Sequence, residues 1–425
     1  MPSWSERRLP IPPRASTRYR YTRRRWHVLF AIIDAVGAWL FALGRYLFGS
    51  RQLVPLDEVR SILLMQLDHL GDALFTTAML PALRERFPHA RLEVLAAPWN
   101  QAVFAAHEVD AIHVWATNRF QRGGNWRWPI ELVAWAWKLR QKRFDLAIDV
   151  RGELPQAALI WLAGCRRRVG WSDGGGAFLL TDVLQHQPGV HELDARRELL
   201  RILDVSPNIL GQIRPRWPIN DRDRRAVQTT IDSPDDGAGP LVVVHVGAGT
   251  LAKRWTLAHL QELLGRLIVE LNARVVLVGS ADERAWADQI TQGRVWPQVV
   301  DRVGQLTLGE LAALCERAAV FVGADSGPAH LAAAVACPVV ALFSGTNHVA
   351  QWRPVGSLVR VLKHEVACSP CHRQACPWAD HPCMTGIRPE QVLAAVRELI
   401  VEPAVLEEPR AIPIRLAPLV SLGER

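Results

Sequence analysis

Two nucleotide-binding patterns are missing from this sequence. It contains neither G-x-G-x-x-G nor G-x-x-x-x-G-K-[ST], the glycine patterns of the usual dinucleotide site and of the P-loop. A standard dinucleotide-binding protein and a P-loop NTPase are therefore excluded. The sequence also lacks a convincing secretory cleavage signal, and its cysteines are odd in number, at seven. We therefore expect a reducing, cytoplasmic location.

Acidic residues are scarce at the start of the chain. Residues 1–25 hold eight Arg and one acid, Glu6, and so carry +7 of the formal net charge of +8. The rest of the chain is close to neutral. A nucleic-acid enzyme usually spreads basic charge over its folded surface, so we expect no nucleic-acid partner. A basic arm on a neutral body fits an anionic membrane surface better.

An uninterrupted membrane-spanning run is also missing. The apolar stretch Trp26–Phe48 is nearly long enough to cross a bilayer, but Asp34 and Arg45 interrupt it. Three interpretations remain: a helix lying in the membrane plane, a true span, or a helix docked on the protein's own core. A span with the Arg cluster inside would place the enzyme body outside the cytoplasm. We therefore expect residues 1–56 to form a basic arm and a membrane-interface helix.

Strands alternate with helices over most of the remaining chain. Continuous apolar runs predict buried parallel strands at Ser61–Leu67, Arg91–Ala96, Asp145–Val150, Leu241–Val246, Arg274–Gly279, Ala319–Val322 and Val339–Phe343. A helix is expected over Ala73–Phe87. The polar, glycine-containing segment 231–240 reads as a linker.

These patterns predict an α/β protein with two doubly wound units, at residues 57–230 and 240–400, followed by a tail at 402–425. A cleft between two such units is a common ligand site.

The first candidate site is the turn after the first strand, LDHLGDALFTT. Gly71 and Asp72 lie at a strand-to-helix junction, which faces the crevice in such a sheet. Asp72 is either an ordinary acid at a helix start or the general base for an acceptor hydroxyl. The helix start would favour the ionised carboxylate, so we expect a weak base that acts late in the reaction.

The second candidate is the glycine turn Gly247-Ala248-Gly249-Thr250, which is followed by Lys253. A glycine-rich turn entering a helix offers free N–H groups to phosphate. Thr250 adds a hydroxyl donor, and Lys253 adds a charge that would neutralise a leaving diphosphate.

The third candidate is GADSGPAH, residues 323–330, after another apolar strand. Ser326 is expected to cap a helix, and Pro328 to occupy an early helical position. Asp325 or His330 can point into the cleft. An ordinary capped helix is the alternative, but two phosphate-suited loops facing a turn carboxylate favour a donor–acceptor arrangement.

Two segments bear on metal binding. Asp221-Arg222-Asp223 is formally an Asp-x-Asp pair, but it lies in a polar run near the linker and is interpreted as a solvated surface. Cys368, Cys371, Cys376 and Cys383 lie within sixteen residues. They could hold a structural zinc or an iron–sulfur cluster, although their spacing is not a standard pair of knuckles. The alternative is a set of reduced thiols in a surface loop.

Three of these segments resemble the family 9 glycosyltransferases, and most closely the bacterial ADP-heptose:lipopolysaccharide heptosyltransferases. The opening ILLMQLDHLGDALFTTAMLPALRERFPHARLEVLA is similar to the family's first segment, VVVHVGAGTLAKRWTLAHLQEL to its phosphate loop, and FVGADSGPAHLAAAVACPVVALFSGT to its donor signature. The run CSPC…CPWADHPCMTGIRPEQV is similar to many members. The resemblance covers roughly residues 58–398.

The resemblance implies a GT-B architecture of two facing Rossmann-like domains. It implies inverting, metal-independent transfer from ADP-heptose to Kdo–lipid A or a partly built inner core, with no cofactor required. Carried residue by residue, Asp72 takes the base position. Donor contacts fall on Thr250, Lys253, Glu283, Asp325, Ser326, Gly327 and His330. The basic extension and the Asp68-His69 pair depart from the usual pattern. We expect a monomer at the inner face of the inner membrane, bound through residues 1–48.

Arg119, Arg122 and Arg127 are candidates for binding acceptor phosphates or Kdo carboxylates, and a solvated loop is the alternative. A different nucleotide-sugar and glycan acceptor, or an epimerase or hydrolase on the same fold, would use much the same architecture. A non-catalytic membrane scaffold is the remaining class. All versions of the transferase hypothesis require the segments around residues 72, 250 and 327 to meet across one groove.

Overall fold

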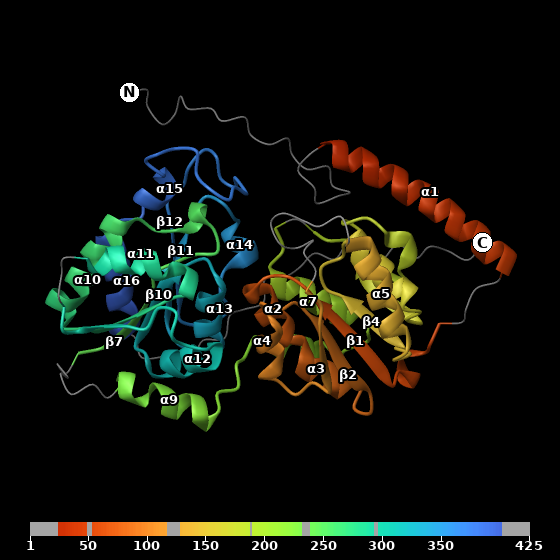
Figure 1. Ribbon diagram of the computed structural model, residues 1–425, viewed down its shortest axis with the longest axis horizontal. Coiled ribbons are helices and arrows are strands. Elements are labelled where there is room, and N and C mark those ends of the chain that lie inside the picture. Colours follow the sequence, from red (N-terminus) through yellow and green to blue (C-terminus); the bar gives the residue numbers. More distant parts are fainter. Residues whose placement is uncertain are drawn as a thin grey trace.

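The protein consists of two α/β units side by side, with one long helix along the first unit (Figure 1). The computed structural model describes residues 24–48, 53–116, 128–187, 189–231, 239–292 and 296–401. The basic arm up to residue 23 and the tail from residue 402 lie outside these ranges.

The first unit is built on a six-stranded parallel sheet of order β3-β2-β1-β4-β5-β6. All six residues of the central strand β1 are buried, which agrees with its apolar sequence. The strands are β1 (Ser61–Gln66), β2 (Arg91–Ala96), β3 (Ala111–Val114), β4 (Leu146–Asp149), β5 (Arg167–Trp171) and β6 (Asp182–Leu184).

The second unit repeats this topology, with the order β12-β11-β10-β7-β8-β9. Its strands are β7 (Leu241–His245), β8 (Arg274–Val278), β9 (Val299–Asp301), β10 (Val320–Ala324), β11 (Val339–Phe343) and β12 (Val359–Lys363). The strand order reverses between β1 and β4, and again between β7 and β10. A doubly wound sheet binds its ligand at such a point, beyond the carboxyl ends of the strands. The predicted architecture of two Rossmann-like domains is confirmed.

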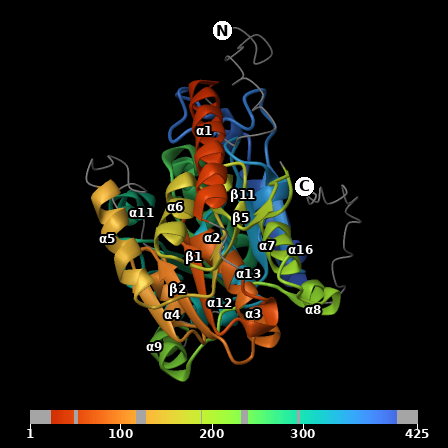
Figure 2. The same ribbon diagram turned by 90° about the vertical axis from the view of Figure 1, so that its right-hand side faces the viewer.

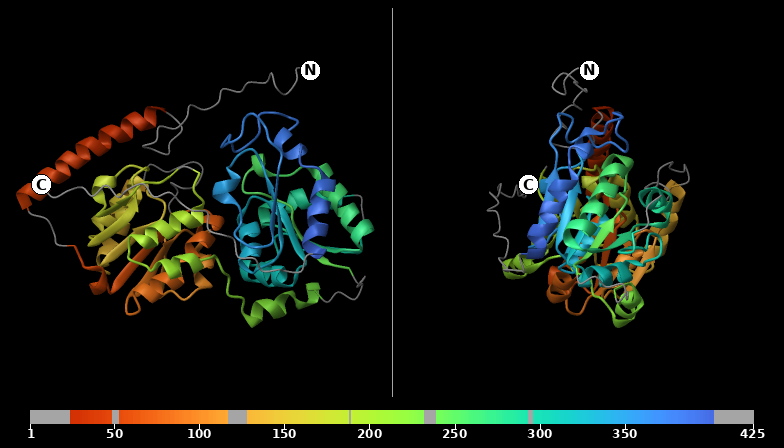
Figure 3. Two further views of the ribbon diagram at one scale, coloured as in Figure 1. Left: turned by 180° about the vertical axis from the view of Figure 1, so that it is seen from behind. Right: turned by 90° about the vertical axis from the view of Figure 1, so that its left-hand side faces the viewer.

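Helices cover both faces of the two sheets. The first unit has η2 (Leu56–Glu58), α2 (Leu70–Thr77), α3 (Met79–Arg86), α4 (Gln101–Ala105), α5 (Trp128–Arg140), α6 (Leu154–Leu162), η3 (Ala177–Leu179), α7 (Glu192–Arg201) and α8 (Pro207–Gln212). After these come α9 (Asp221–Ile231), η4 (Leu251–Lys253), α10 (Leu257–Leu271), η5 (Ala281–Glu283), α11 (Arg284–Thr291), α12 (Leu308–Arg317), α13 (Gly327–Ala334), α14 (Val349–Trp352), α15 (Pro382–Thr385) and α16 (Pro389–Val401). In Figure 3 the blue helix α16 lies against the green helix α10.

The single helix expected over Ala73–Phe87 was wrong, because the structure divides it at Ala78 into α2 and α3. Pro81 explains the break. It has no N–H to donate to the carbonyl of residue 77, whereas proline is tolerated in the first turn of a new helix.

Helix α9 opens with the Asp221-Arg222-Asp223 run and packs against α12. Arg224 holds Glu316 with two hydrogen bonds of 2.8 Å. Asp221 and Arg222 are exposed. The run therefore forms a helix surface, as predicted, and does not follow a buried strand.

The apolar stretch near the start of the chain forms α1 (Arg24–Phe48), which docks along the first unit (Figure 2). Phe30 and Asp34 are buried, and Asp34 Oδ1 accepts a 2.7 Å hydrogen bond from the Gly176 amide. Phe41 makes edge-to-face contacts with Trp161 and Phe178. Within the described ranges, no helix combines the length and the apolar character needed to cross a bilayer.

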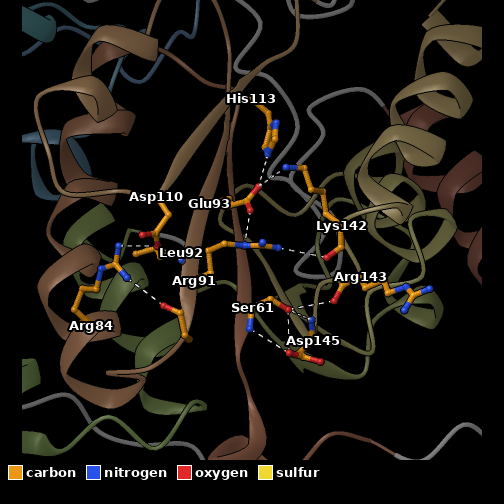
Figure 4. Close-up of polar contacts among 11 residues, drawn as sticks. Ser61, Arg84, Arg91, Leu92, Glu93, Asp110, His113, Lys142, Arg143 and Asp145 are labelled. Carbon is orange, nitrogen blue, oxygen red and sulfur yellow. Dashed lines mark hydrogen bonds and ion pairs between the residues drawn. The ribbon is translucent and has the colours of Figure 1, made fainter.

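A polar cluster holds the amino ends of the first sheet's central strands, away from the carboxyl ends (Figure 4). Asp145 Oδ2 accepts hydrogen bonds from the amide and hydroxyl of Ser61. The buried Glu93 lies 2.6 Å from Arg91 and 2.5 Å from His113. A buried carboxylate is tolerated only when it is paired, so we regard this cluster as structural.

Candidate active site

The helices α2 and α13 belong to different units, and their first turns touch each other. A Cβ atom added to Gly327 would lie 2.4 Å from Leu70 Cδ2, and one added to Gly71 would lie 3.0 Å from His330 Cδ2. The two glycines thus permit a close approach that larger residues would obstruct. The prediction that the segments around residues 72 and 327 meet is confirmed, and Figure 1 shows α2 and α13 facing each other between the units.

Asp72 lies in the first turn of α2, with its side chain 15% exposed. Arg196 Nη2 of α7 is 4.0 Å from Asp72 Oδ1. That guanidinium is held by Glu192 Oε2 at 2.6 Å and by Thr76 Oγ1 at 3.4 Å. The candidate base therefore lies beside a buried ion pair.

Burial raises the pKa of Asp72, and the negative charge of Glu192 raises it further. Arg196 and Lys253 act in the opposite direction but do not cancel these effects, and the pKa is about 7. The expectation that the helix start would make Asp72 a weak base is wrong. Desolvation and a neighbouring carboxylate outweigh the helix end. A carboxyl group with this pKa is suited to general-base work at neutral pH.

Lys253 joins the two loops of the second unit. Its Nζ lies 2.7 Å from Asp325 Oδ2 and 3.2 Å from the Asp325 carbonyl oxygen. Asn347 donates a further 2.8 Å hydrogen bond to the same carboxylate oxygen. Asp325 is buried and serves to position Lys253, while the charge of Lys253 reaches Asp72 across the domain boundary. The segments around residues 72, 250 and 327 thus form one constellation.

Two polar atoms of this constellation are buried without a partner among the described residues: Thr250 Oγ1 and His330 Nδ1. His330 packs edge-to-face on Phe75, with 4.9 Å between the ring centres. Burial lowers the pKa of His330 to about 4, so the ring is neutral at pH 7. Buried polar groups normally have partners, so the lack of one singles out these two atoms as candidates for ligand contacts.

Ser326 precedes the first residue of α13, but its side chain makes no capping bond. Its hydroxyl donates instead to the Ala324 carbonyl at 3.1 Å and lies 3.4 Å from His245 Nδ1. The capping role predicted for Ser326 is therefore wrong, because these neighbours turn the hydroxyl away from the helix amides. Pro328 does occupy the first turn, as predicted.

Glu283 lies against the glycine turn of the second unit. Its Oε2 accepts a 2.7 Å hydrogen bond from the Ser280 amide and lies 3.4 Å from His245 Nε2. Burial alone would raise the pKa of Glu283, but His245 and Ser280 hold it at about 2. A Cβ atom on Gly247 would lie 1.5 Å from Glu283 Oε1, so the glycine makes room for this carboxylate.

No sequence motif predicts the side chains that link the two units around Asp72. Gln351 Nε2 donates a 2.9 Å hydrogen bond to Glu192 Oε1, and His191 Nε2 lies 2.9 Å from the Arg353 carbonyl oxygen. These residues belong to no local pattern after a buried strand. The nearest signal is the acidic start of α7, which reads equally well as an ordinary helix N-terminus.

Asp68, at which the sequence departs from the pattern of the family it resembles, has structural contacts. It forms an ion pair with Arg151, which follows β4. Its carbonyl oxygen accepts hydrogen bonds from Trp99 at 2.8 Å and Asn100 at 2.7 Å. These contacts fix the turn that leads to Asp72. His69, the second departure, precedes α2 without a side-chain capping bond. Arg119, Arg122 and Arg127 lie outside the described residues.

The four clustered cysteines line one pocket, together with Trp378 and His381. They carry free thiols. Burial and the neighbouring thiols raise the pKa of Cys383 to about 11. No three His, Cys, Asp or Glu side chains of the described ranges are grouped so that they could hold a metal ion. The geometry gives no support for a structural zinc or an iron–sulfur cluster.

Comparison with known proteins gives one consistent result. Residues 133–380 match the family described as glycosyltransferase family 9 (heptosyltransferase). The chain is 26% identical to lipopolysaccharide heptosyltransferase 3 of Escherichia coli over 67% of this chain and 83% of that protein. It is 26% identical to lipopolysaccharide heptosyltransferase 1 of Pseudomonas aeruginosa over 81% of this chain and 99% of that protein.

A similar fold occurs in the solved structure of E. coli ADP-heptose lipopolysaccharide heptosyltransferase II. The TM-score is 0.65, with 23% identity over 80% of this chain and 98% of that one.

Proposed function

Because this chain belongs to glycosyltransferase family 9, the heptosyltransferase family, and is thus a glycosyltransferase, we propose that it moves heptose from ADP-heptose to the inner core of lipopolysaccharide. The observation that carries the proposal is the position of Asp72. This carboxyl group, with a pKa of about 7, lies at the contact between the two units and within reach of the charge of Lys253.

In the proposed reaction, the first unit supplies the base and the second unit holds the donor. Asp72 accepts the proton of an acceptor hydroxyl while that oxygen attacks the anomeric carbon of the sugar. The bond from that carbon to the diphosphate breaks, and the nucleoside diphosphate leaves with the electron pair. Attack from the face opposite the leaving group inverts the anomeric centre, through a transition state with oxocarbenium character.

Lys253 and the glycine turn stabilise the charge that develops on the diphosphate. Lys253 is already fixed by Asp325, whose carboxylate is in turn held by Asn347, so little reorganisation is needed at the moment of reaction. The hydroxyls of Thr250 and Ser326 and the neutral ring of His330 supply further contacts to the donor. Glu283, which lies against Gly247 of the glycine turn, is proposed to contact the nucleoside portion. Since these groups provide the positive charge and the donors, we propose transfer without a metal ion.

The acceptor is proposed to bind on the first unit, whose face beside Asp72 carries the Asp68–Arg151 pair. Arg119, Arg122 and Arg127 are proposed to contact acceptor phosphates or carboxylates. The protein is proposed to act in the cytoplasm, where nucleotide-sugars are found. We also propose that it acts as a monomer. A transferase using another nucleotide-sugar is the alternative within the same fold.

The test uses purified full-length protein, ADP-heptose and truncated lipopolysaccharide, in wild type and Asp72→Asn. We expect the variant to lose roughly 10²–10⁴-fold in turnover while it still binds ADP-heptose in calorimetry. Equal product from both proteins would remove Asp72 from its role. Release of free heptose without acceptor modification would indicate a hydrolase instead. Nuclear magnetic resonance of the product reports the anomeric configuration, and a chelator tests metal independence.

A further inference from the structure

Helix α1 has two distinct faces. The docked face carries Phe30, Asp34, Gly37 and Phe41, spaced by four, three and four residues, which places them on one side of a helix. Phe178 fills the space beside Gly37, so closely that an added Cβ would lie 2.3 Å from the ring. Together with the Asp34–Gly176 hydrogen bond, this contact fixes the rotation of α1 about its own axis.

The opposite face is apolar and open to solvent. It includes Trp39, Leu40 and Tyr46, with 64%, 55% and 85% of their surface exposed. The remaining members of this outer face are Val28, Leu29, Ile32, Val36, Leu43 and Leu47. They recur every three or four residues along the helix and form a single stripe without a charged side chain. An exposed apolar patch of this length marks an interaction site.

A second exposed apolar stripe lies on α5, formed by Ile130, Val133 and Trp137. Helix α5 packs against α6, and Trp161 of α6 contacts Phe41 of α1. Figure 2 shows α6 between α1 and α5 on one side of the first unit. The two stripes therefore lie on neighbouring helices of the first unit, on either side of α6.

The positive charge next to α1 indicates what the outer face of this helix binds. Residues 1–25, which lead directly into α1, carry eight Arg and one acid. Such a cluster is attracted to anionic lipid headgroups, and Trp and Tyr rings favour the boundary between headgroups and acyl chains. In a symmetric dimer through the outer face, two strongly basic arms would start beside the same interface and repel each other. A span would expose Asp34 to lipid and break its hydrogen bond to Gly176.

We propose that the outer face of α1 lies in the plane of an anionic membrane and holds the first unit against the bilayer in one fixed orientation. The apolar stripe enters the headgroup region, while the docked face keeps its contacts with η3 and α6. The inference does not depend on the proposed reaction, because it concerns lipid alone and requires neither donor nor acceptor.

The experiment is co-sedimentation of the full-length protein with phosphatidylcholine vesicles, with and without phosphatidylglycerol. Leu40→Glu places a charge in the stripe. Ala38→Glu adds the same charge at an exposed position of α1 outside the stripe. We expect wild type to bind only the anionic vesicles and to be released by high salt. Leu40→Glu should weaken binding by at least about tenfold, since it removes apolar burial and adds a charge at the interface, and Ala38→Glu by no more than about twofold.

Circular dichroism and thermal unfolding verify that both variants are folded, and Ile32→Glu serves as a second stripe variant. Equal binding by all variants, or no binding by wild type, would overturn the proposal. A lipid-free dimer that Leu40→Glu dissociates would show that a second copy covers the stripe. If alkaline carbonate failed to extract the bound protein from the vesicles, α1 would span the membrane. Either of these results would also overturn it.

Discussion

Gln351 of the second unit donates a 2.9 Å hydrogen bond to Glu192 of the first, and the other oxygen of Glu192 holds Arg196 beside Asp72. Two side chains, Glu192 and Arg196, therefore connect the contact between the units to the candidate base Asp72. Without the contact between the units, Glu192 would lose its hydrogen bond from Gln351, and the charges around Asp72 could rearrange. We therefore expect the reactivity of Asp72 to depend on this contact.

The pH profile of transfer tests this relationship. Activity of the wild type should fall as pH drops through about 7, because Asp72 then gains a proton and can no longer accept one. Glu192→Gln removes a negative charge that raises the pKa of Asp72 and frees Arg196 to pair with it. The acid limb of the kcat/KM profile should therefore move to lower pH. Glu198→Gln, a change at a half-buried position of the same helix whose partner is Arg201, should leave the limb in place. A profile that does not respond to Glu192→Gln would contradict the assignment.

Lys253→Met tests the proposed stabilisation of the leaving diphosphate. We expect kcat/KM to fall by roughly 10²–10³-fold, as for the loss of one fixed group that stabilises transition-state charge. Lys253→Arg should not restore the activity, because the carboxylate and carbonyl oxygens of Asp325 are arranged around a compact ammonium group and not a planar fork. Lys363→Met, at a surface ion pair of the same unit, is the matched control. Similar losses in both Met variants would refute a specific role of Lys253.

Gly327→Ala tests whether close approach of the two units is needed. The new methyl group would lie 2.4 Å from Leu70 Cδ2 and should force α2 and α13 apart. Because misplacement by about 1 Å can cost about 10²-fold in rate, we expect kcat to fall at least about tenfold with little change in the unfolding temperature. Gly265→Ala on α10 meets no atom within 4 Å and should keep full activity. Steady-state kinetics and thermal unfolding of both variants test whether activity needs the contact between α2 and α13. An unchanged kcat in Gly327→Ala would mean that this contact is dispensable.

Much of the architecture could be predicted because the central strands are fully buried. β1, β7 and β11 read as continuous apolar runs, and the sequence places them within one residue of their observed bounds. The edge strands β3, β6, β9 and β12 could not be found in this way, since none of them is fully buried. Their pairing is determined by the neighbouring strand and not by their own composition.

The candidate site likewise contains residues that the sequence predicts and residues that it does not. Asp72, Lys253 and His330 follow buried strands in recognisable turns, so their local sequence predicts a place at the strand ends. Glu192 and Arg196 come from α7 and reach Asp72 only through tertiary packing. The pKa of Asp72 depends on burial and on these partners. The helix start alone predicts a lowered pKa, whereas the pKa is raised.

The meeting of α2 and α13 has an electrostatic consequence for the protein without substrate. Both helices begin at the domain boundary, so the positive ends of two peptide dipoles oppose each other there. An anion placed between them would relieve this repulsion. A diphosphate bound between them would therefore stabilise the contact between the two units, whereas adenosine, which has no phosphate, would not. Phosphate groups of a bound nucleotide would then contribute to the cohesion of the two units as well as to affinity.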